Sequence, residues 1–318
     1  MVVEKPVTRE QLVLRLGCSA AGKTVLRDRY MAYPLSISPV FRLEEEGSRA
    51  YVYRMNTSPG LLAGDRIGMT LHLEDSSALY LADQAATKVH AMPARESERE
   101  LKCDKGRERL DKGLEGDERP QAQVQYTVEV GEQATLEFLP EPLILFAASE
   151  LRQTTEIAIA PTAGLSWGEI ILPGRLARGE AYQFRECWST LRLKTLTGEL
   201  LLVETTRLLG QANRFSPNQS SPNQSAQSDL FSSGAVMGLL VLCLPSEFCS
   251  KETLTKLSHE IDALCTDSLS VASSILPGER GLFVRAVANT AQEMQRSFKA
   301  AADAVRKLRN QAPLPYSV

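Results

Sequence analysis

The sequence contains few side chains that bind transition metals tightly, with only 3 histidines and 6 cysteines among 318 residues. The two cysteines nearest each other, Cys243 and Cys249, are separated by five residues, whereas zinc sites and thiol redox motifs use a two-residue spacing. Any metal must therefore be held by carboxylate or carbonyl oxygens, which bind such ions weakly. We expect no tightly bound cofactor.

The sequence also lacks a long apolar run and an excess of one charge. Its longest apolar stretch, residues 236–244, is far shorter than the roughly 20 residues that span a bilayer. The first ten residues contain no apolar segment typical of a secretion signal. With 36 basic and 39 acidic residues the net charge is −3, so no overall positive field attracts nucleic acid. These features predict a cytoplasmic protein that binds neither membranes nor nucleic acid.

The common catalytic motifs are absent as well, since neither G-x-S-x-G nor H-E-x-x-H occurs. One motif does match: residues 17–24 read GCSAAGKT and fit the P-loop pattern G-x-x-x-x-G-K-[ST], which binds nucleotide phosphates. A P-loop fold needs parallel strands separated by helices. The pattern that follows instead favours hairpins. We therefore expect no enzyme activity and keep a P-loop nucleotide hydrolase that uses Gly17 to Thr24 as the alternative.

Two segments differ from the rest of the chain in composition. Residues 92–122 are dense in charges of both signs with few apolar positions, which predicts a disordered insertion. Residues 211–234 contain SPNQS twice in tandem, which predicts a flexible low-complexity loop. We interpret the whole chain, residues 1–318, as one domain that carries these two insertions.

A repeated pattern of alternating apolar residues lies between these segments. Aligned without gaps, residues 71–83, 128–140 and 157–169 share apolar residues at the first, third, ninth and eleventh positions, with a turn between the two halves. Residues 191–204 give a fourth, shifted copy. Each copy is typical of a β-hairpin. The repeat predicts an elongated, β-helix-like stack of hairpins in which each unit covers its neighbour.

The C-terminal third has a different pattern. Residues 236–244 and 281–287 are typical of buried strands, and residues 252–264 of a short helix. From Ala291 to Leu308 apolar residues recur at spacings of three or four, which predicts a long helix packed on the β structure. The fold class is therefore mainly β with two helices in the C-terminal third.

Four segments resemble the urease accessory protein family UreD, also called UreH. They read SPGLLAGDRI (58–67), ADQAATKVH (82–90), LEFLPEPLILFAASELRQTTEI (136–157) and WGEIILPGRLARGE (167–180), in the order found in that family. The resemblance implies a largely β protein without catalytic activity that acts as a nickel-insertion chaperone. It also implies the partners: the urease apoprotein, UreF, UreG bound through UreF, and UreE as a nickel donor.

The resemblance further implies that Ni²⁺ moves transiently through an internal passage lined by polar side chains. Acidic residues at the ends of the repeat copies are candidates for the same role, because a row of carboxylates lowers the cost of bringing a cation into a low-dielectric interior. Gly64 and Asp65 could instead only form a tight turn, and Lys88 could neutralise a carboxylate. The candidate nickel-path residues are Asp65, Asp83, Glu141, Glu169, Glu180 and Glu204, with Gly64, Gln84, Thr87 and Lys88 as further passage or motif residues.

Overall fold

The computed structural model describes residues 10–43, 48–93, 121–210 and 236–314. Most of the predicted insertion 92–122 and all of the predicted loop 211–234 lie outside these residues. Two residues at the margins of the first segment belong to the folded part: Met92 is buried, and Ala122 begins a strand.

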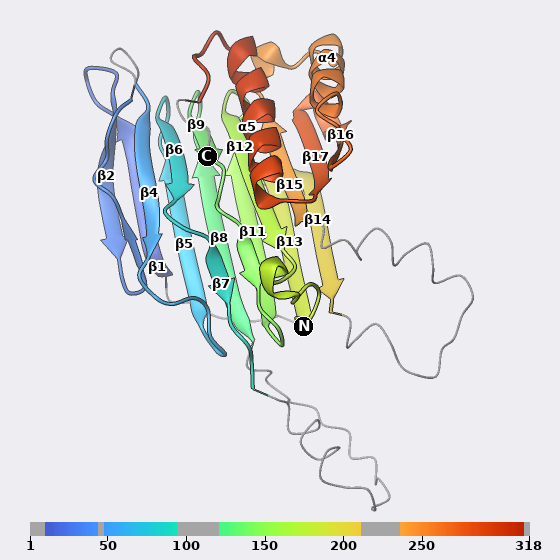
Figure 1. Cartoon of the computed structure of the whole chain (residues 1–318). Helices are drawn as coiled ribbons and strands as arrows, with labels where there is room; N and C mark the ends of the chain where they lie inside the picture. Colours follow the sequence, from blue (N-terminus) through green and yellow to red (C-terminus); the bar gives the residue numbers. More distant parts are fainter. Residues whose placement is uncertain (1–9, 44–47, 94–120, 211–235, 315–318) are drawn as a thin grey trace, which may run out of the picture.

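Within the described residues the strands form two sheets (Figure 1). The seven-stranded sheet has the order β14 (Leu200–Leu209), β13 (Glu186–Thr195), β11 (Glu150–Ile159), β8 (Ala122–Val130), β5 (Arg66–Leu73), β1 (Glu10–Cys18) and β2 (Thr24–Met31). The ten-stranded sheet has the order β16 (Leu269–Ile275), β17 (Gly281–Ala288), β15 (Val236–Cys243), β12 (Gly164–Leu172), β9 (Thr135–Phe138), β6 (Ala78–Asp83), β4 (Ala50–Asn56) and β3 (Leu35–Ile37), with β10 (Leu143–Leu145) joining β12 to β7 (Thr87–Val89).

The C-terminal elements confirm the sequence prediction closely. Strands β15 and β17 and the helices α4 (Lys251–Asp262) and α5 (Ala291–Leu308) lie where the apolar periodicity placed them. The described part of the chain is thus mainly β with two α-helices. Short 3₁₀ turns occur in the connections at Leu176–Arg178, Ser246–Phe248 and Pro277–Glu279. No helix in this part is both long and apolar enough to cross a membrane.

The predicted hairpins are wrong for the first three copies of the repeat. The two halves of each copy lie in different sheets: β5, β8 and β11 in the smaller one, β6, β9 and β12 in the larger one. Corresponding strands pair in parallel, and the pairing register equals the ungapped sequence alignment: Leu71 pairs with Val128, and Val128 with Ile157. In the other sheet Leu81 pairs with Phe138 and Phe138 with Trp167. The repeat is real, but its unit passes from one sheet to the other.

The fourth copy does form a hairpin, in which β13 and β14 pair antiparallel around a turn containing Gly198. Gly198 has a φ of +93°, a conformation that glycine adopts without strain. Because both sheets mix parallel and antiparallel pairs and neither closes on itself, the predicted β-helix-like stack is not confirmed.

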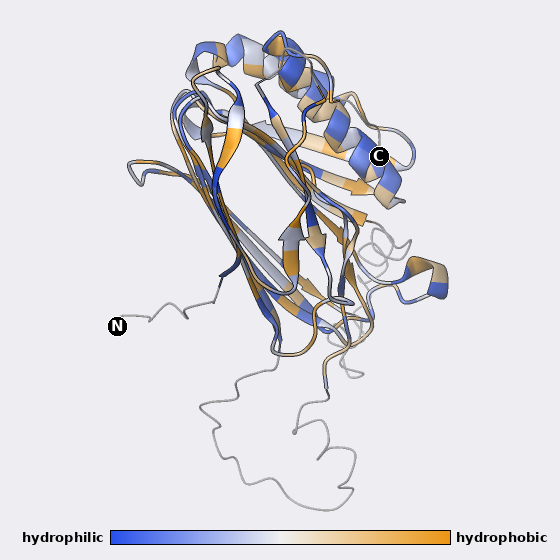
Figure 2. Cartoon of the chain, turned by 90° about the vertical axis from the view of Figure 1, so that its left-hand side faces the viewer, coloured by the Kyte–Doolittle hydropathy of each residue, from blue (hydrophilic) through white to orange (hydrophobic). Residues whose placement is uncertain are grey.

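The two faces of the larger sheet pack against different partners, following the two-residue period of a strand. In β15, Leu239, Val241 and Cys243 pack in the core between the sheets, while Leu240 and Leu242 pack in a second cluster with the helices. Figure 2 shows the strand layers edge-on with both helices gathered at one end. Helix α5 packs close to strand β15 because the strand has a glycine, Gly238, at the contact. A Cβ at this position would lie 2.4 Å from the Met294 sulfur of the helix.

The P-loop alternative fails on this geometry. Residues 17–24 end β1, form a tight turn and begin β2, and these two strands pair antiparallel. A P-loop needs its lysine in a loop between a strand and the N-terminus of a helix, where backbone N–H groups converge on the phosphates. Here the residue after Lys23 starts another strand, so the match is a coincidence of sequence.

A buried charge cluster fixes helix α5 to the larger sheet. The carboxylate of Glu137, in β9, accepts hydrogen bonds from Arg306 of α5 at 2.8 and 3.1 Å and also from Arg49. All three side chains are almost fully buried. This cluster joins the start of β4, the middle of the sheet and the end of the last helix.

Replacing this buried carboxylate tests the cluster. We expect Glu137→Ala to lower the free energy of unfolding by about 3–5 kcal/mol, because it removes the carboxylate that two buried guanidinium groups share. Glu156→Ala is the matched control: Glu156 also lies on a strand and pairs with an arginine, Arg192, at 2.9 Å, but in an exposed position. The control substitution should lower the free energy of unfolding by less than about 1 kcal/mol. Equal losses in chemical denaturation would show that the buried cluster has no special role.

Candidate functional site

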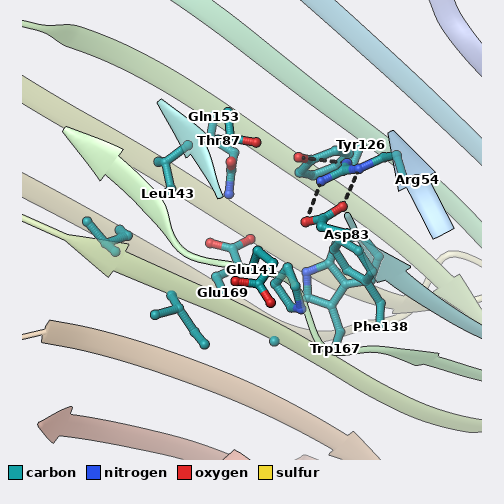
Figure 3. Close-up of a pocket in the computed structure, with 14 residues that line it drawn as sticks. Arg54, Asp83, Thr87, Tyr126, Phe138, Glu141, Leu143, Gln153, Trp167 and Glu169 are labelled. Atoms are coloured by element: carbon teal, nitrogen blue, oxygen red, sulfur yellow. Dashed lines mark hydrogen bonds and ion pairs between the residues drawn. The ribbon is translucent and has the colours of Figure 1, made fainter. Parts of the chain in front are cut away.

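A small polar cavity lies between the two sheets, in the part of the molecule built from the repeats (Figure 3). It encloses about 40 Å³, which is room for a few water molecules at roughly 10–15 Å³ each. Both sheets contribute to its walls, and so does the segment that follows β9. Four of the predicted residues line it: Asp83, Thr87, Glu141 and Glu169.

Asp83 is neutralised by an arginine at one end of this cavity. Arg54, its partner in the β4–β6 register, donates to the two carboxylate oxygens at 2.6 and 2.9 Å. The same guanidinium donates to the Tyr126 hydroxyl at 3.1 Å, across the gap between the sheets. Burial is the largest single influence on the pKa of Arg54 and lowers it, but the charges of Asp83 and Tyr126 and the hydrogen bonds to both together raise it. Arg54 and Asp83 thus form a buried ion pair with two hydrogen bonds.

Glu169 is held differently, by neutral donors of the opposite sheet. Its carboxylate oxygens accept hydrogen bonds from Thr155 of β11 at 3.0 Å and Ser189 of β13 at 2.9 Å. The residue is only 7 % exposed. Burial raises the pKa of the Glu169 carboxyl, and the two hydroxyl donors offset part of that shift. Glu169 is thus a buried carboxyl that can exchange its proton.

Glu141 faces the same cavity from the segment between β9 and β10. Partial burial raises the pKa of this carboxyl, a hydrogen bond with Gln295 of α5 lowers it, and the nearby charge of Asp83 raises it further. Two of the three acidic side chains in this cavity therefore favour the protonated form more than free carboxyls do.

A larger cavity of about 310 Å³ adjoins the small one. Glu169 and Ile171 line both, so these two side chains lie between the two spaces. The larger cavity lies between β14 of one sheet and β15 and β17 of the other. It contains a fifth predicted residue, Glu204, whose carboxylate accepts hydrogen bonds from Arg285 at 2.6 and 2.7 Å.

The other predicted residues do not line either cavity. Gly64 and Asp65 form the tight turn before β5, where an Asp65 oxygen accepts the Leu62 N–H at 2.8 Å. Glu180 pairs with Arg175 beside the first 3₁₀ turn, and hydrogen bonding from Arg175 lowers the pKa of this carboxyl. The side chains of Gln84 and Lys88 are exposed. The structure thus brings together Asp83, Thr87, Glu141, Glu169 and Glu204 and leaves Asp65, Glu180, Gly64, Gln84 and Lys88 elsewhere.

The sequence reasoning missed the residues that set the charge of these cavities. Arg54 and Arg285 lie on strands outside the repeat copies and outside the resembling segments. The hydroxyls of Thr155 and Ser189 lie on the neighbouring parallel strands β11 and β13, where Ser189 pairs with Gln153 and Thr155 with Leu191, so the two come together only through the sheet order. Among the described residues no group of three or more His, Cys, Asp or Glu side chains could hold a metal ion. A cation in these cavities would therefore meet one or two carboxylates, hydroxyls and water.

Comparison with known proteins assigns the family. Residues 9–317 match the family described as UreD urease accessory protein. The chain belongs to the UreD family. It is 37% identical over 311 residues to the urease accessory protein UreD of Trichodesmium erythraeum, covering 98% of this chain and 99% of that protein. It is 30% identical over 295 residues to urease accessory protein UreD 2 of Streptomyces griseus, covering 92% of this chain and 88% of that protein. UreD proteins are accessory proteins, and the predicted family and non-catalytic role are confirmed.

The protonation of Glu169 makes stability depend on pH in a defined direction. The pKa of Glu169 is higher in the folded chain than the roughly 4.3 of a free glutamate. The folded state therefore binds more protons than the unfolded state, and the free energy of unfolding falls as the pH rises from about 4.3 through the raised pKa. We expect Glu169→Gln to remove this fall, so that the variant gains stability relative to wild type as the pH increases. Urea denaturation of both proteins between pH 4 and 9 measures this difference in the free energy of unfolding. A difference that does not change with pH would contradict a raised pKa.

Proposed function

We propose that this chain serves in urease maturation as a scaffold that helps deliver Ni²⁺ into the urease active site. In this proposal it binds the urease apoprotein and UreF, and UreG through UreF, and the cation moves through the space between the two sheets. Its relatives are urease accessory proteins, which supports a role in urease maturation. The acid-lined cavities support the movement of the cation between the sheets.

The observation that carries the passage is the position of Glu169. Its side chain lines both the small cavity and the large one, and in this proposal a cation moving between them passes this carboxyl. Asp83 and Glu141 lie on one side of it and Glu204 on the other. The carboxylates therefore form a sequence of weak oxygen sites rather than one closed cage.

Weak oxygen sites suit a protein that must release its cargo. Ni²⁺ binds imidazole and thiolate ligands more tightly than single carboxylates, so a closed Cys or His site would retain it. Carboxylates still offset part of the cost of moving a divalent cation from water into a low-dielectric interior. Hydroxyls such as those of Thr155 and Ser189, together with water, can supply further oxygen ligands.

Proton exchange at Glu169 and Glu141 adjusts the charge during transit. Their raised pKa values shift both carboxyls toward the neutral form relative to a free glutamate, which limits the cost of burying them. When Ni²⁺ arrives, a carboxyl that holds a proton releases it to water, and the new carboxylate balances one of the two positive charges. When the cation leaves, the proton returns.

Nickel loading of urease tests the proposal directly. Urease is co-expressed with its other accessory proteins and with either this chain, no chain, or the Glu169→Gln variant. We expect nickel-poor, inactive urease without the chain, and a several-fold loss of nickel per urease with Glu169→Gln, because a neutral amide cannot replace the carboxylate that balances the cation.

Glu180→Gln is the matched control for this experiment. Glu180 is also a predicted nickel-path residue, but it pairs with Arg175 and lines neither cavity. Urease should be loaded normally with this variant. Equal loading with and without the chain would contradict the maturation role, and normal loading with Glu169→Gln would contradict the passage alone.

A further inference from the structure

An exposed ion pair lies in the wall of the larger cavity. Glu204 projects from β14, an edge strand of the smaller sheet, and Arg285 from β17 of the larger sheet, so the pair joins the two sheets. One guanidinium nitrogen lies 2.6 and 2.7 Å from the two carboxylate oxygens. The Glu204 side chain is 13% exposed, whereas that of Arg285 is 64% exposed. The arginine therefore lies on the solvent side of the carboxylate.

The two ion pairs of the cavities differ in how easily they separate. The Arg54–Asp83 pair is buried and shares a further hydrogen bond with Tyr126, so separating it would strand a charge in the interior. Arg285 keeps most of its surface in water and lies over the ring of Phe283, with its guanidinium carbon 5.3 Å from the ring centre. Exposed pairs of this kind are weak, so Arg285 can swing away at small cost.

We propose that Arg285 is a displaceable gate that selects divalent cations at the Glu204 end of the passage. The inference rests on the proposed transit of Ni²⁺ through the cavities. A cation reaching Glu204 must take over the two carboxylate oxygens that Arg285 occupies. A monovalent cation offers the same charge as the guanidinium and gains little from the exchange. A divalent cation interacts about twice as strongly at equal distance and displaces it.

The experiment measures cation entry in the full-length chain alone, with Mn²⁺ as a paramagnetic probe. Met237 lines the larger cavity, so the NMR signal of its labelled methyl group broadens when Mn²⁺ binds there. Met31 in β2, at the opposite edge of the smaller sheet from β14, provides the reference signal. We expect Arg285→Gln to lower the Mn²⁺ concentration for half-broadening of Met237 about two- to fivefold, the size expected when an exposed ion pair no longer competes.

Two further variants make the result specific. The double variant Arg285→Gln, Glu204→Gln should not show the lowered Mn²⁺ midpoint, because it lacks the carboxylate that removal of Arg285 makes available. Arg207→Gln is the matched control, since Arg207 also lies on β14 and forms an exposed pair, with Glu186 at 2.6 Å. It should behave as wild type. An unchanged midpoint in Arg285→Gln, or an equal shift in Arg207→Gln, would overturn the gate.

This test separates the gate from the passage. Urease loading does not enter the Mn²⁺ titration, so a shifted midpoint in Arg285→Gln stands even if Glu169→Gln loads urease normally and the passage fails. Conversely, an unshifted midpoint together with poor loading by Glu169→Gln would retain the passage and reject the gate.

Discussion

The parallel register between repeat copies is the constraint on which the site depends. Each of the first three copies contributes one strand to each sheet, and these strands pair in parallel with the same position of the next of the three copies. The turns between the halves stack as well, since the Ser76 N–H donates to the Glu132 carbonyl and the Gln133 N–H donates to the Thr162 hydroxyl. Because the register is fixed, residues at the same position of these three copies lie side by side along the space between the sheets. Apolar positions fill most of this space, and the polar last position leaves Asp83 and Glu169 inside it.

Buried charge in this interior is handled in two ways that have different consequences. Where a permanent charge is kept, an arginine neutralises it, as Arg54 does for Asp83 and as Arg49 and Arg306 do for Glu137. These pairs also link elements far apart in the sequence. Glu169 receives only neutral hydrogen bonds, so its charge can change with its proton or with a bound cation. A carboxyl with a raised pKa loses stabilising effect as the pH increases, which fits a role in the proposed transit of a cation better than a role in holding the fold.

The secondary structure could be predicted from the sequence to a large extent, but the pairing of the strands could not. The helix α5 follows from the spacing of Met294, Phe298 and Ala301, and the repeat from its ungapped alignment. A strand, a four-residue turn and a strand have the same two-residue periodicity whether the strands pair with each other or cross to opposite sheets. The hairpin interpretation was therefore wrong for β5–β6 and right for β13–β14, with no local difference to separate them.

The same limit applies to the site. The acidic residues at the ends of the repeat copies could be predicted because the repeat marks them, and three of them, Asp83, Glu169 and Glu204, do line the cavities. Asp65 and Glu180 were chosen by resemblance alone and lie elsewhere. The arginines that pair with Asp83 and Glu204 come from strands β4 and β17, whose neighbours in space are set only by the sheet order.

The measurement that tests the central claim most directly blocks the passage without changing its charge. Ile171 lines both cavities, so Ile171→Trp would fill the space where they meet. Urease would be purified from cells that express this variant with the other accessory proteins, and its nickel content determined after checking that the variant still co-purifies with urease. The account predicts nickel-poor urease bound to an intact scaffold. Fully loaded urease would show that nickel does not travel between the sheets.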